Sequence, residues 1–428
     1  MDEPSLAAAL RGVLGAVTIK GLTQLSGGAS RETWSFDAVG PGGSRTGLVL
    51  RRDPPGRPSE PGAMSREARV IKASRAAGLA VPEVLVSTEE PDLWGTAGLV
   101  MRRVAGETIA RRILRDDAYR QARKVLVRQV GGFAAGLHAL EVPGHLPAAD
   151  PLAGLRAQLA EFEQVSPVFD LALRTLEADR PPDRQPVIVH GDLRLGNLIV
   201  GPDSLRAVID WELVHAGDPA EDLGWFCVKA WRFGARAPAA GLGSREKLLA
   251  AYRAAGGADI TPDELRWWEV FGTLRWGVIC MEQAQAHLSG AHRSVELAAV
   301  GRRVCEQEWD LLLLLAPDAS AQAAARRPRV TGAVQPAPAP HGRPTASELL
   351  EAVREFLSGQ VMPAFSGQVM PASTGQLAFN ARVAANTLAI VARELELGAI
   401  SPEAGLADTV AAKLAVANPG YFDPAPPP

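Results

Sequence analysis

The sequence predicts an α+β protein with a small β-rich lobe, a larger helical lobe and a small all-α C-terminal domain. Residues 17–104 contain short stretches rich in β-branched and aromatic residues, separated by Gly, Pro or Ser. From about residue 117, long amphipathic patterns typical of helices dominate. An Ala- and Pro-rich stretch without periodicity then indicates a linker. We therefore expect lobes at 1–104 and 105–316, a linker at 317–343 and a helical domain at 344–422.

Length and composition restrict the class of protein. A chain of 428 residues, 47% hydrophobic and 22% charged, is typical of a globular protein of two or three domains. The net charge of -3 gives no general attraction to nucleic acid or membranes. The longest apolar run, "LLLLLA" at 311–316, is far shorter than the roughly 20 residues that span a bilayer. Three single cysteines and an acidic N-terminus indicate buried thiols in a cytoplasmic protein without a secretory signal.

The first lobe contains five predicted strands and one helix. The strands are "VTIKGLTQL", "TWSFDAV", "GLVLRR", "VLVST" and "GLVMRRV". The helix, "SREARVIKASRAAG" at 65–78, has apolar residues at helical spacing and ends at a glycine. Between the first two strands lies "LSGGASRET" (25–33), which contains Ser30. This loop is predicted either to bind phosphates through its backbone N–H groups or to be a plain hairpin turn.

The second lobe is predicted to be helical around a short strand-rich centre. Long helical patterns start with "DAYRQARKVLVRQVGGFAAGLHAL" and resume with "ELRWWEVFGTLRWGVICMEQAQAHL" at 264–288, on either side of strand-like residues 187–211. Asp218 is expected to cap a helix. Apolar faces predict that several ring-bearing side chains belong to the core: His138, Trp267, Trp268 and Trp276.

The C-terminal domain is predicted to contain three helices. The first starts at Pro344 with a capping box of Thr345 and Glu348. Helices at about 375–397 and 401–417 follow. The heptapeptide "SGQVMPA" occurs at 358–364 and again at 366–372. Two copies are too few for a repeat fold, so we expect a duplicated loop.

The stretch "VIVHGDLRLGNLIV" (187–200) carries the chemistry. A strand would deliver His190 and Asp192 into a tight turn, and Asn197 would open the next strand. The chain has only four asparagines, and this is the only one before residue 380. The following strand, "LRAVIDWE", ends with Asp210 and Glu212. A carboxylate, a carboxamide and a second carboxylate can thus converge, and such hard oxygen ligands suit Mg²⁺ bound together with substrate phosphates.

The H-x-D-x-x-x-x-N spacing of this stretch is also that of the protein-kinase catalytic loop. A turn whose polar residues satisfy backbone groups would explain Asp192 alone. The sequence resembles the aminoglycoside phosphotransferase and choline kinase-like family, in the branch associated with acyl-CoA dehydrogenases. The resemblance rests on "VIVHGDLRLGN", "AVIDWE" and "GDPAEDLGW" and covers about residues 15–315. It implies a bilobal protein-kinase-like fold, and the C-terminal part resembles a small helical domain of unknown role joined to this branch.

The resemblance also implies roles for the motif residues. Asp192 would orient the acceptor hydroxyl and take its proton. Asn197 and Asp210 would bind the Mg²⁺ ions that bridge the phosphates of ATP. His190 would brace the loop, and Asp222 would brace it from the following helix, a structural role in both cases.

In the first lobe, the resemblance places nucleotide-binding residues on two strands and the helix. Strand alternation puts Val49 and Arg51 on one face, so that the first packs on adenine and the second reaches phosphate. Family members carry lysine where this chain has Arg51, and the neighbouring Arg52 is a rival for the role. Glu67 would form an ion pair with the arginine, although a glutamate near a helix start also stabilises the helix dipole. Backbone groups from Met101 to Arg103 would contact the adenine edge.

We expect an ATP- and Mg²⁺-dependent phosphotransferase acting on a hydroxyl of a small molecule, with a hydroxyacyl-CoA or another anionic acceptor as the sharper hypothesis. A polycationic aminoglycoside would require carboxylates, because like charges penalise binding. The excess of basic residues at 225–258 would also be explained by a helix face exposed to solvent. Two other functions stay open: an antibiotic kinase, and a nucleotide-binding scaffold that partners an acyl-CoA dehydrogenase. Residues 225–258 have one acid, Glu246, against six basic residues: Lys229, Arg232, Arg236, Arg245, Lys247 and Arg253.

Overall fold

The computed structural model divides the chain into two compact units. Residues 1–149 and 182–269 form the first unit, and residues 150–181 and 270–427 form the second. The structure describes residues 2–25, 31–56, 60–91, 93–148, 150–162, 166–331, 350–351, 353–355, 357–362 and 372–422, with only the backbone described for 360 and 372–376. Within these residues, no helix is long and apolar enough to cross a membrane.

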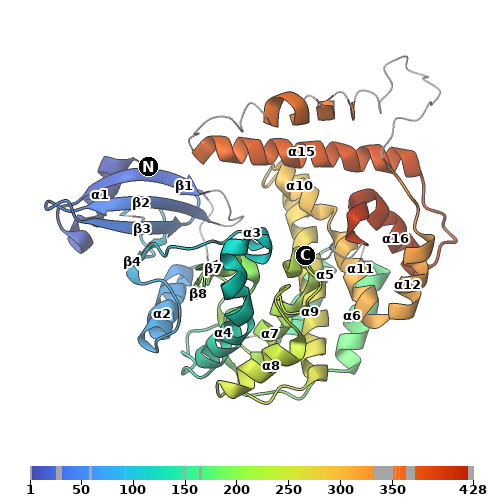
Figure 1. Cartoon of the computed structure of the whole chain (residues 1–428), viewed down its shortest axis with the longest axis horizontal. Helices are drawn as coiled ribbons and strands as arrows, with labels where there is room; N and C mark the ends of the chain where they lie inside the picture. Colours follow the sequence, from blue (N-terminus) through green and yellow to red (C-terminus); the bar gives the residue numbers. More distant parts are fainter. Residues whose placement is uncertain are drawn as a thin grey trace. The chain divides into compact units, whose positions relative to one another are not determined.

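The first lobe is a five-stranded antiparallel sheet with strand order β1-β2-β3-β5-β4, shown in blue in Figure 1. All five predicted strands are confirmed, as is the predicted α+β fold with a β-rich lobe before a helical one. The strands are β1 (Thr18–Leu25), β2 (Glu32–Val39), β3 (Arg45–Arg52), β4 (Val84–Thr88) and β5 (Gly98–Arg102). Helix α2 (Ala63–Ala76) connects β3 to β4, as predicted.

Alternation along β3 separates the core of the lobe from its functional face. Leu48 and Leu50 are fully buried in a cluster with Phe36. Val49 and Arg51 point to the opposite face of the sheet, as the period of two requires. The cluster also includes Leu6 and Leu10 of helix α1 (Glu3–Leu14), which the sequence analysis did not predict. Asp2 caps the N-terminus of α1: its carboxylate accepts a hydrogen bond from the Ser5 N–H at 2.9 Å.

The helical part of the first unit surrounds two small antiparallel sheets, β6 with β9 and β7 with β8. Helices α4 and α8 pack closely there because Gly131 carries no side chain: a Cβ at that position would lie 2.9 Å from the Cβ of Ala251. The elements are α3 (Ala110–Arg115), η1 (Asp117–Tyr119), α4 (Arg120–His138), β6 (Val187–Val189), η2 (Leu195–Asn197), β7 (Leu198–Val200), β8 (Leu205–Val208), β9 (His215–Gly217), α7 (Pro219–Cys227), η3 (Lys229–Arg232) and α8 (Arg245–Ala254).

Several predictions about this part of the chain are confirmed. Asp218 caps α7 by accepting a hydrogen bond from the Ala220 N–H at 2.7 Å. His138 is a buried core histidine that contacts the Tyr252 hydroxyl at 2.8 Å. Trp267 and Trp268 are buried as well, whereas Trp276 is only partly buried. All three cysteines are buried and free.

The second unit is helical, and α9 (Pro262–Leu288) continues into it from the first. Helix α11 lies at its centre, where buried acidic side chains bind the C-terminal segment: Glu308 pairs with Lys413 at 3.2 Å and Asp310 accepts a hydrogen bond from the Tyr421 hydroxyl at 2.7 Å. The elements are α5 (Pro151–Ala160), α6 (Pro167–Ala178), α10 (Val295–Gly301), α11 (Val304–Leu315), α12 (Pro317–Arg326), η4 (Leu357–Val361), α15 (Ala372–Leu397), α16 (Leu406–Ala417) and η5 (Pro419–Tyr421).

The C-terminal part differs from the sequence prediction at two points. The first "SGQVMPA" copy, expected to be a loop, begins within the helical segment η4 (Leu357–Val361). Residues 317–326, expected to begin the linker, form α12, which starts with a proline in the favoured first turn. Helices α15 and α16 confirm the second and third predicted helices. The predicted capping box of Thr345 and Glu348, with Pro344, lies outside the described residues, as does most of the second "SGQVMPA" copy. The domain boundaries at 344 and 422 stay a prediction.

Candidate active site

The catalytic-loop candidate connects β6 to β7 and is held by its own backbone. The buried Asp222 carboxylate of α7 accepts hydrogen bonds from the His190 N–H at 2.8 Å and the Gly191 N–H at 3.0 Å. Gly191 has φ of 79°, and a Cβ there would lie 2.5 Å from the Leu213 carbonyl oxygen, so only glycine fits. Asp222 also contacts His138 Nε2 at 3.3 Å. Two helices therefore anchor the start of the loop.

The His190 ring links the loop to the strand that precedes Asp210. Its Nδ1 accepts a hydrogen bond from the Asp192 N–H at 3.2 Å, so the ring proton lies on Nε2. That Nε2–H donates to the Ile209 carbonyl oxygen at 3.2 Å. The ring also packs against Trp211, with ring centroids 4.6 Å apart. His190 thus contacts backbone on both sides of the site and supports it structurally.

The Asp192 carboxylate is surrounded by hydrogen-bond donors. Asn197 Nδ2 donates to its Oδ2 at 2.6 Å, and Arg194 Nε lies 2.9 and 3.0 Å from its two oxygens. Trp225 Nε1 donates to Oδ1 at 2.8 Å. Sequence reasoning missed Arg194 and Trp225. Each had a signal in its position: Arg194 lies inside "VIVHGDLRLGN", and Trp225 ends "GDPAEDLGW".

Asn197 and Asp210 lie next to each other across the β7–β8 pair. The Ile209 N–H donates to the Asn197 carbonyl oxygen at 2.9 Å, which places Asp210 one residue beyond this contact. Asp210 has φ of 70°, a left-handed conformation uncommon for a residue other than glycine and a form of strain found at functional sites. The structure therefore brings together the three residues that the motif singles out.

Arg51 connects the first lobe to this group. Its Nη1 lies 3.0 Å from Glu67 Oε1 and its Nη2 lies 2.6 Å from Asp210 Oδ1. Arg52, the rival, lies on the other face of β3, where it pairs with Glu32 at 2.8 Å and donates to the Trp94 carbonyl oxygen at 2.6 Å. Arg51 is therefore the arginine that reaches the site.

The sequence also predicts nucleotide-binding roles for Val49, Met101, Arg103 and Ser30. Val49 pairs with Met101 across β3 and β5, on the face that carries Arg51. The Arg103 N–H donates to the Gly47 carbonyl oxygen at 2.8 Å, and its side chain pairs with Asp37 at 2.5 Å. Arg103 is thus engaged within the sheet and does not offer that N–H to adenine. Ser30 lies outside the described residues.

Comparison with known proteins decides the family. A family model described as phosphotransferase enzyme family matches residues 21–268, more than half of the chain. The chain belongs to the phosphotransferase enzyme family. Residues 371–405 of this phosphotransferase match a domain of unknown function, DUF6285.

Individual proteins are similar to this chain in sequence or in fold. Acyl-CoA dehydrogenase family member 10 of Mus musculus is 32% identical over 195 residues, 42% of this chain and 18% of that protein. The phosphotransferase thus matches only about a fifth of the length of this relative. A choline/ethanolamine kinase family protein from Mesorhizobium loti shares the fold, with a TM-score of 0.52, 20% identity and coverage of 73% of this chain and 93% of that one. A thermostable mutant of aminoglycoside phosphotransferase APH(4)-Ia, in ternary complex with AMP-PNP and hygromycin B, has a TM-score of 0.50 at 20% identity, with 74% and 99% coverage.

Charge pairing governs the electrostatics of the site. Burial by itself lowers the pKa of the Arg51 guanidinium, but the surrounding carboxylates, Asp210 first, outweigh burial and raise that pKa above its ordinary value. Burial raises the pKa of Asp210, but the charge of Arg51 outweighs this and lowers it overall. Both side chains are therefore ionised at neutral pH.

The side chains of the phosphotransferase fit a magnesium nucleotide. In the described part of the chain, no group of three or more His, Cys, Asp or Glu side chains is arranged to hold a metal ion. Asn197 and Asp210 instead offer one carboxamide and one carboxylate. Mg²⁺ in phosphotransferases needs only one or two such protein ligands, because phosphates and water complete its octahedron. These two residues would hold it.

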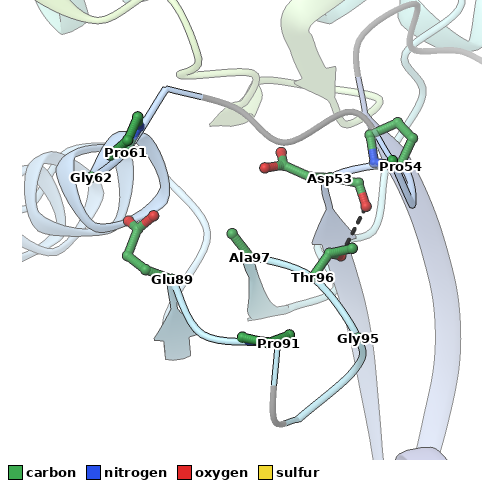
Figure 2. Close-up of a pocket in the computed structure, with 10 residues that line it drawn as sticks. Asp53, Pro54, Pro61, Gly62, Glu89, Pro91, Gly95, Thr96 and Ala97 are labelled. Carbon is green, nitrogen blue, oxygen red and sulfur yellow. Dashed lines mark hydrogen bonds between the residues drawn. The ribbon is translucent and has the colours of Figure 1, made fainter.

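A cavity of about 460 Å³ lies elsewhere in the first lobe (Figure 2). It is lined by residues that follow β3, residues that precede α2 and the loop between β4 and β5. Asp53 lines it, and the Thr96 hydroxyl donates to the Asp53 carbonyl oxygen at 2.8 Å. None of the residues carrying the motif lines this cavity.

Proposed function

We propose that the phosphotransferase transfers the γ-phosphoryl group of Mg-ATP to a hydroxyl of a small anionic molecule, with a hydroxyacyl-CoA as the leading acceptor. The observation that carries the proposal is two contacts of 2.6 Å, Asn197 with Asp192 and Arg51 with Asp210, which the Ile209 N–H to Asn197 carbonyl hydrogen bond brings next to each other. The related APH(4)-Ia structure holds the ATP analogue AMP-PNP, which supports ATP as the donor.

The residues divide the transfer between positioning and charge. The Asp192 carboxylate orients the acceptor hydroxyl and takes its proton as the acceptor oxygen bonds to the γ-phosphorus. The bond between that phosphorus and the β–γ bridging oxygen breaks, and the released ADP carries the electron pair. Bound Mg²⁺ would neutralise charge on the phosphates, and Arg51 adds a fixed positive charge beside them. Asn197 keeps the Asp192 carboxylate in place through its 2.6 Å hydrogen bond.

The structure changes which charges support an anionic acceptor. Arg232 and Arg245 both pair with the buried Glu269, at 2.8 and 2.7 Å, and Arg253 forms an ion pair with Asp259. These partners lie outside the 225–258 window, so the sequence count overstated its excess of positive charge. Three of its six basic side chains are thus paired, and two carboxylates serve these three.

Arg194 takes over as the main support for an anionic acceptor. Its guanidinium carbon lies 4.9 Å from the centre of the Trp231 ring, and its Nε contacts Asp192. Because Arg194 contacts the proposed base Asp192 directly, its guanidinium is suited to bind a carboxylate or phosphate of the acceptor next to the reacting hydroxyl. Binding such an acceptor would also draw Arg194 away from Asp192 and leave that carboxylate ready to accept a proton.

Incubation with Mg-ATP and a panel of hydroxyacyl-CoAs, neutral sugars and aminoglycosides tests the proposal. We expect phosphorylated hydroxyacyl-CoA, detected by mass spectrometry, and an Arg194→Gln variant with a KM for this acceptor raised about tenfold. Arg206→Gln, an exposed arginine paired with Asp203, is the matched control. Phosphorylation of amino sugars alone would remove the anionic acceptor, and no phosphoryl transfer to any hydroxyl would remove the function.

A further inference from the structure

Glu67 binds two arginines, and the second of them is not part of the motif. Arg31, which directly precedes β2, contacts Glu67 Oε2 through its Nη1, while Arg51 contacts Glu67 Oε1 at 3.0 Å. The Arg31 side chain is 5% exposed and that of Glu67 is 1% exposed. Each oxygen of this buried carboxylate therefore has its own arginine.

Arg31 is itself held from two other sides. Its Nε lies 3.5 Å from Asp53 Oδ1 and 3.9 Å from Glu212 Oε2. Asp53 is the residue that also lines the first-lobe cavity, where Figure 2 labels it. The same Glu212 oxygen lies 3.7 Å from Arg51 Nη2. Arg31 thus has fixed partners of opposite charge and does not depend on Arg51 for its position.

The geometry of a guanidinium explains why this matters. Arginine and a carboxylate prefer to pair through two parallel N–H bonds, fork to fork. If Arg51 paired with both oxygens of Glu67 in this way, its Nη2 would lie at Glu67 Oε2 and not beside Asp210. In the structure Nη2 lies 2.6 Å from Asp210 Oδ1 instead. A lysine has a single nitrogen and does not face this choice.

We propose that Arg31 is a positioning residue: by occupying one oxygen of Glu67, it prevents bidentate pairing with Arg51 and directs the second nitrogen of Arg51 towards Asp210 and the nucleotide phosphates. The proposal rests on the proposed function of nucleotide binding. It links two features of this chain, the arginine at 51 and the arginine at 31. Arg31 is then needed because residue 51 is an arginine.

A double-mutant cycle on nucleotide affinity tests this dependence directly. Mg-AMP-PNP is titrated into the full-length protein and into three variants: Arg31→Met, Arg51→Lys and the combination of both. Methionine matches the length of arginine but has no donor for Glu67. We expect Arg31→Met to weaken binding about tenfold in the wild-type background and less than about twofold in the Arg51→Lys background. Arg45→Gln, which changes an exposed arginine on β3, is the matched control and should bind as the wild type does.

Equal losses in both backgrounds would show that Arg31 acts independently of Arg51 and would overturn the inference. If Arg31→Met fails to fold because Asp53 loses its partner, Arg31→Met with Asp53→Asn removes the stranded charge and enters the cycle instead. Arg31→Lys should restore most of the affinity, since one nitrogen is enough to occupy the oxygen.

A structure of nucleotide-free Arg31→Met gives a second readout. Arg51 is expected to pair with both oxygens of Glu67 and to leave Asp210, whereas an unchanged Arg51 contradicts the inference. If the wild-type protein binds no Mg-nucleotide, the proposed function is wrong. If the wild-type protein binds Mg-nucleotide but the double-mutant cycle shows no coupling between residues 31 and 51, only the proposed role of Arg31 is wrong.

Discussion

The catalytic loop and the arginine network of the first lobe hold their charged groups in opposite ways. In the loop, backbone N–H groups of His190 and Gly191 bind Asp222, and Asp192 contacts residues two and five positions away. In the network, Arg51 reaches partners 16 and 159 residues away through side chains alone. The loop therefore combines contacts within five residues with an anchor on its backbone from Asp222, 31 and 32 residues away, whereas the network consists only of side chains from separate segments.

This difference has consequences for robustness. Backbone hydrogen bonds do not depend on side-chain identity, so the loop should keep its shape when its reactive group is changed. The network contains two arginines and four carboxylates, and each buried charge depends on the others. Single substitutions there should move the neighbouring side chains as well as remove one group.

The largest effect is expected from Asp192→Asn. The variant removes the proton acceptor while the backbone contacts that shape the loop stay, so kcat should fall by about 10³-fold. Nucleotide affinity should stay within about twofold of the wild type. Turnover with the preferred acceptor and titration with Mg-AMP-PNP measure the two quantities, and Asp203→Asn, an exposed change in the turn after β7, is the control. A variant that retains full turnover would show that the loop does not do the chemistry.

Arg51→Gln should produce the next largest effect. Loss of the fixed positive charge beside the phosphates is expected to lower kcat/KM for ATP by about 10²-fold. Arg52→Gln is the matched control on the other face of the same strand, and its kcat/KM should change less than about threefold. Steady-state kinetics with ATP varied distinguishes the two. Equal losses would mean that the face of β3 does not decide which arginine acts.

Asp222→Ala tests how much the hydrogen bonds of Asp222 to the loop backbone stabilise the fold. It leaves the N–H groups of His190 and Gly191 without their acceptor in a buried position, which should cost about 2 kcal/mol of unfolding free energy. Urea denaturation followed by tryptophan fluorescence measures this loss. Asp218→Ala, which removes only the cap of the same helix, should cost about 1 kcal/mol. A stability loss no larger than that of the cap variant would contradict the anchoring role.

Acid should weaken the same anchor by a smaller amount. Burial raises the pKa of Asp222, but contacts with His138 and His190 outweigh it and hold the pKa below the ordinary 3.8. A depressed carboxyl pKa contributes stability that is fully present above the unfolded-state value and is lost as pH falls through the folded-state value. The loss should therefore begin below about pH 4. As the pH is lowered below about 4, the urea concentration at the midpoint of unfolding should decrease for the wild type and should decrease less steeply for Asp222→Asn.

Much of the fold could be predicted because its signals are local. Five strands of the first lobe and the helices α2, α4, α15 and α16 follow the periodicity of their own residues. Helix α1 was missed because its signal is the short Asp-Glu-Pro start before an alanine-rich segment. Helix α12 was missed because an Ala- and Pro-rich composition resembles a linker, whereas packing against α16 within the second unit stabilises it as a helix.

The same distinction applies to the site. Spacing along "HGDLRLGN" and "VIDWE" was enough to bring Asp192, Asn197 and Asp210 together, because a strand, a tight turn and a paired strand leave their side chains little freedom. Arg194 was overlooked although it lies inside the motif. Arg31 and Glu269 had no signal at all, since each acts on a residue far from it in the chain.

The sequence by itself determined the turn that carries Asp192, the proximity of Asn197 and Asp210, and the β-rich and helical lobes, because residues within about twenty positions of one another constrain the backbone that carries them. Tertiary structure alone decided which charges are neutralised: Glu269 pairs with two arginines of the supposed acceptor region, and Glu67 has one arginine on each oxygen. The physical reason is that an ion pair depends on distance in space, and long side chains from separate elements meet only after the backbone has folded.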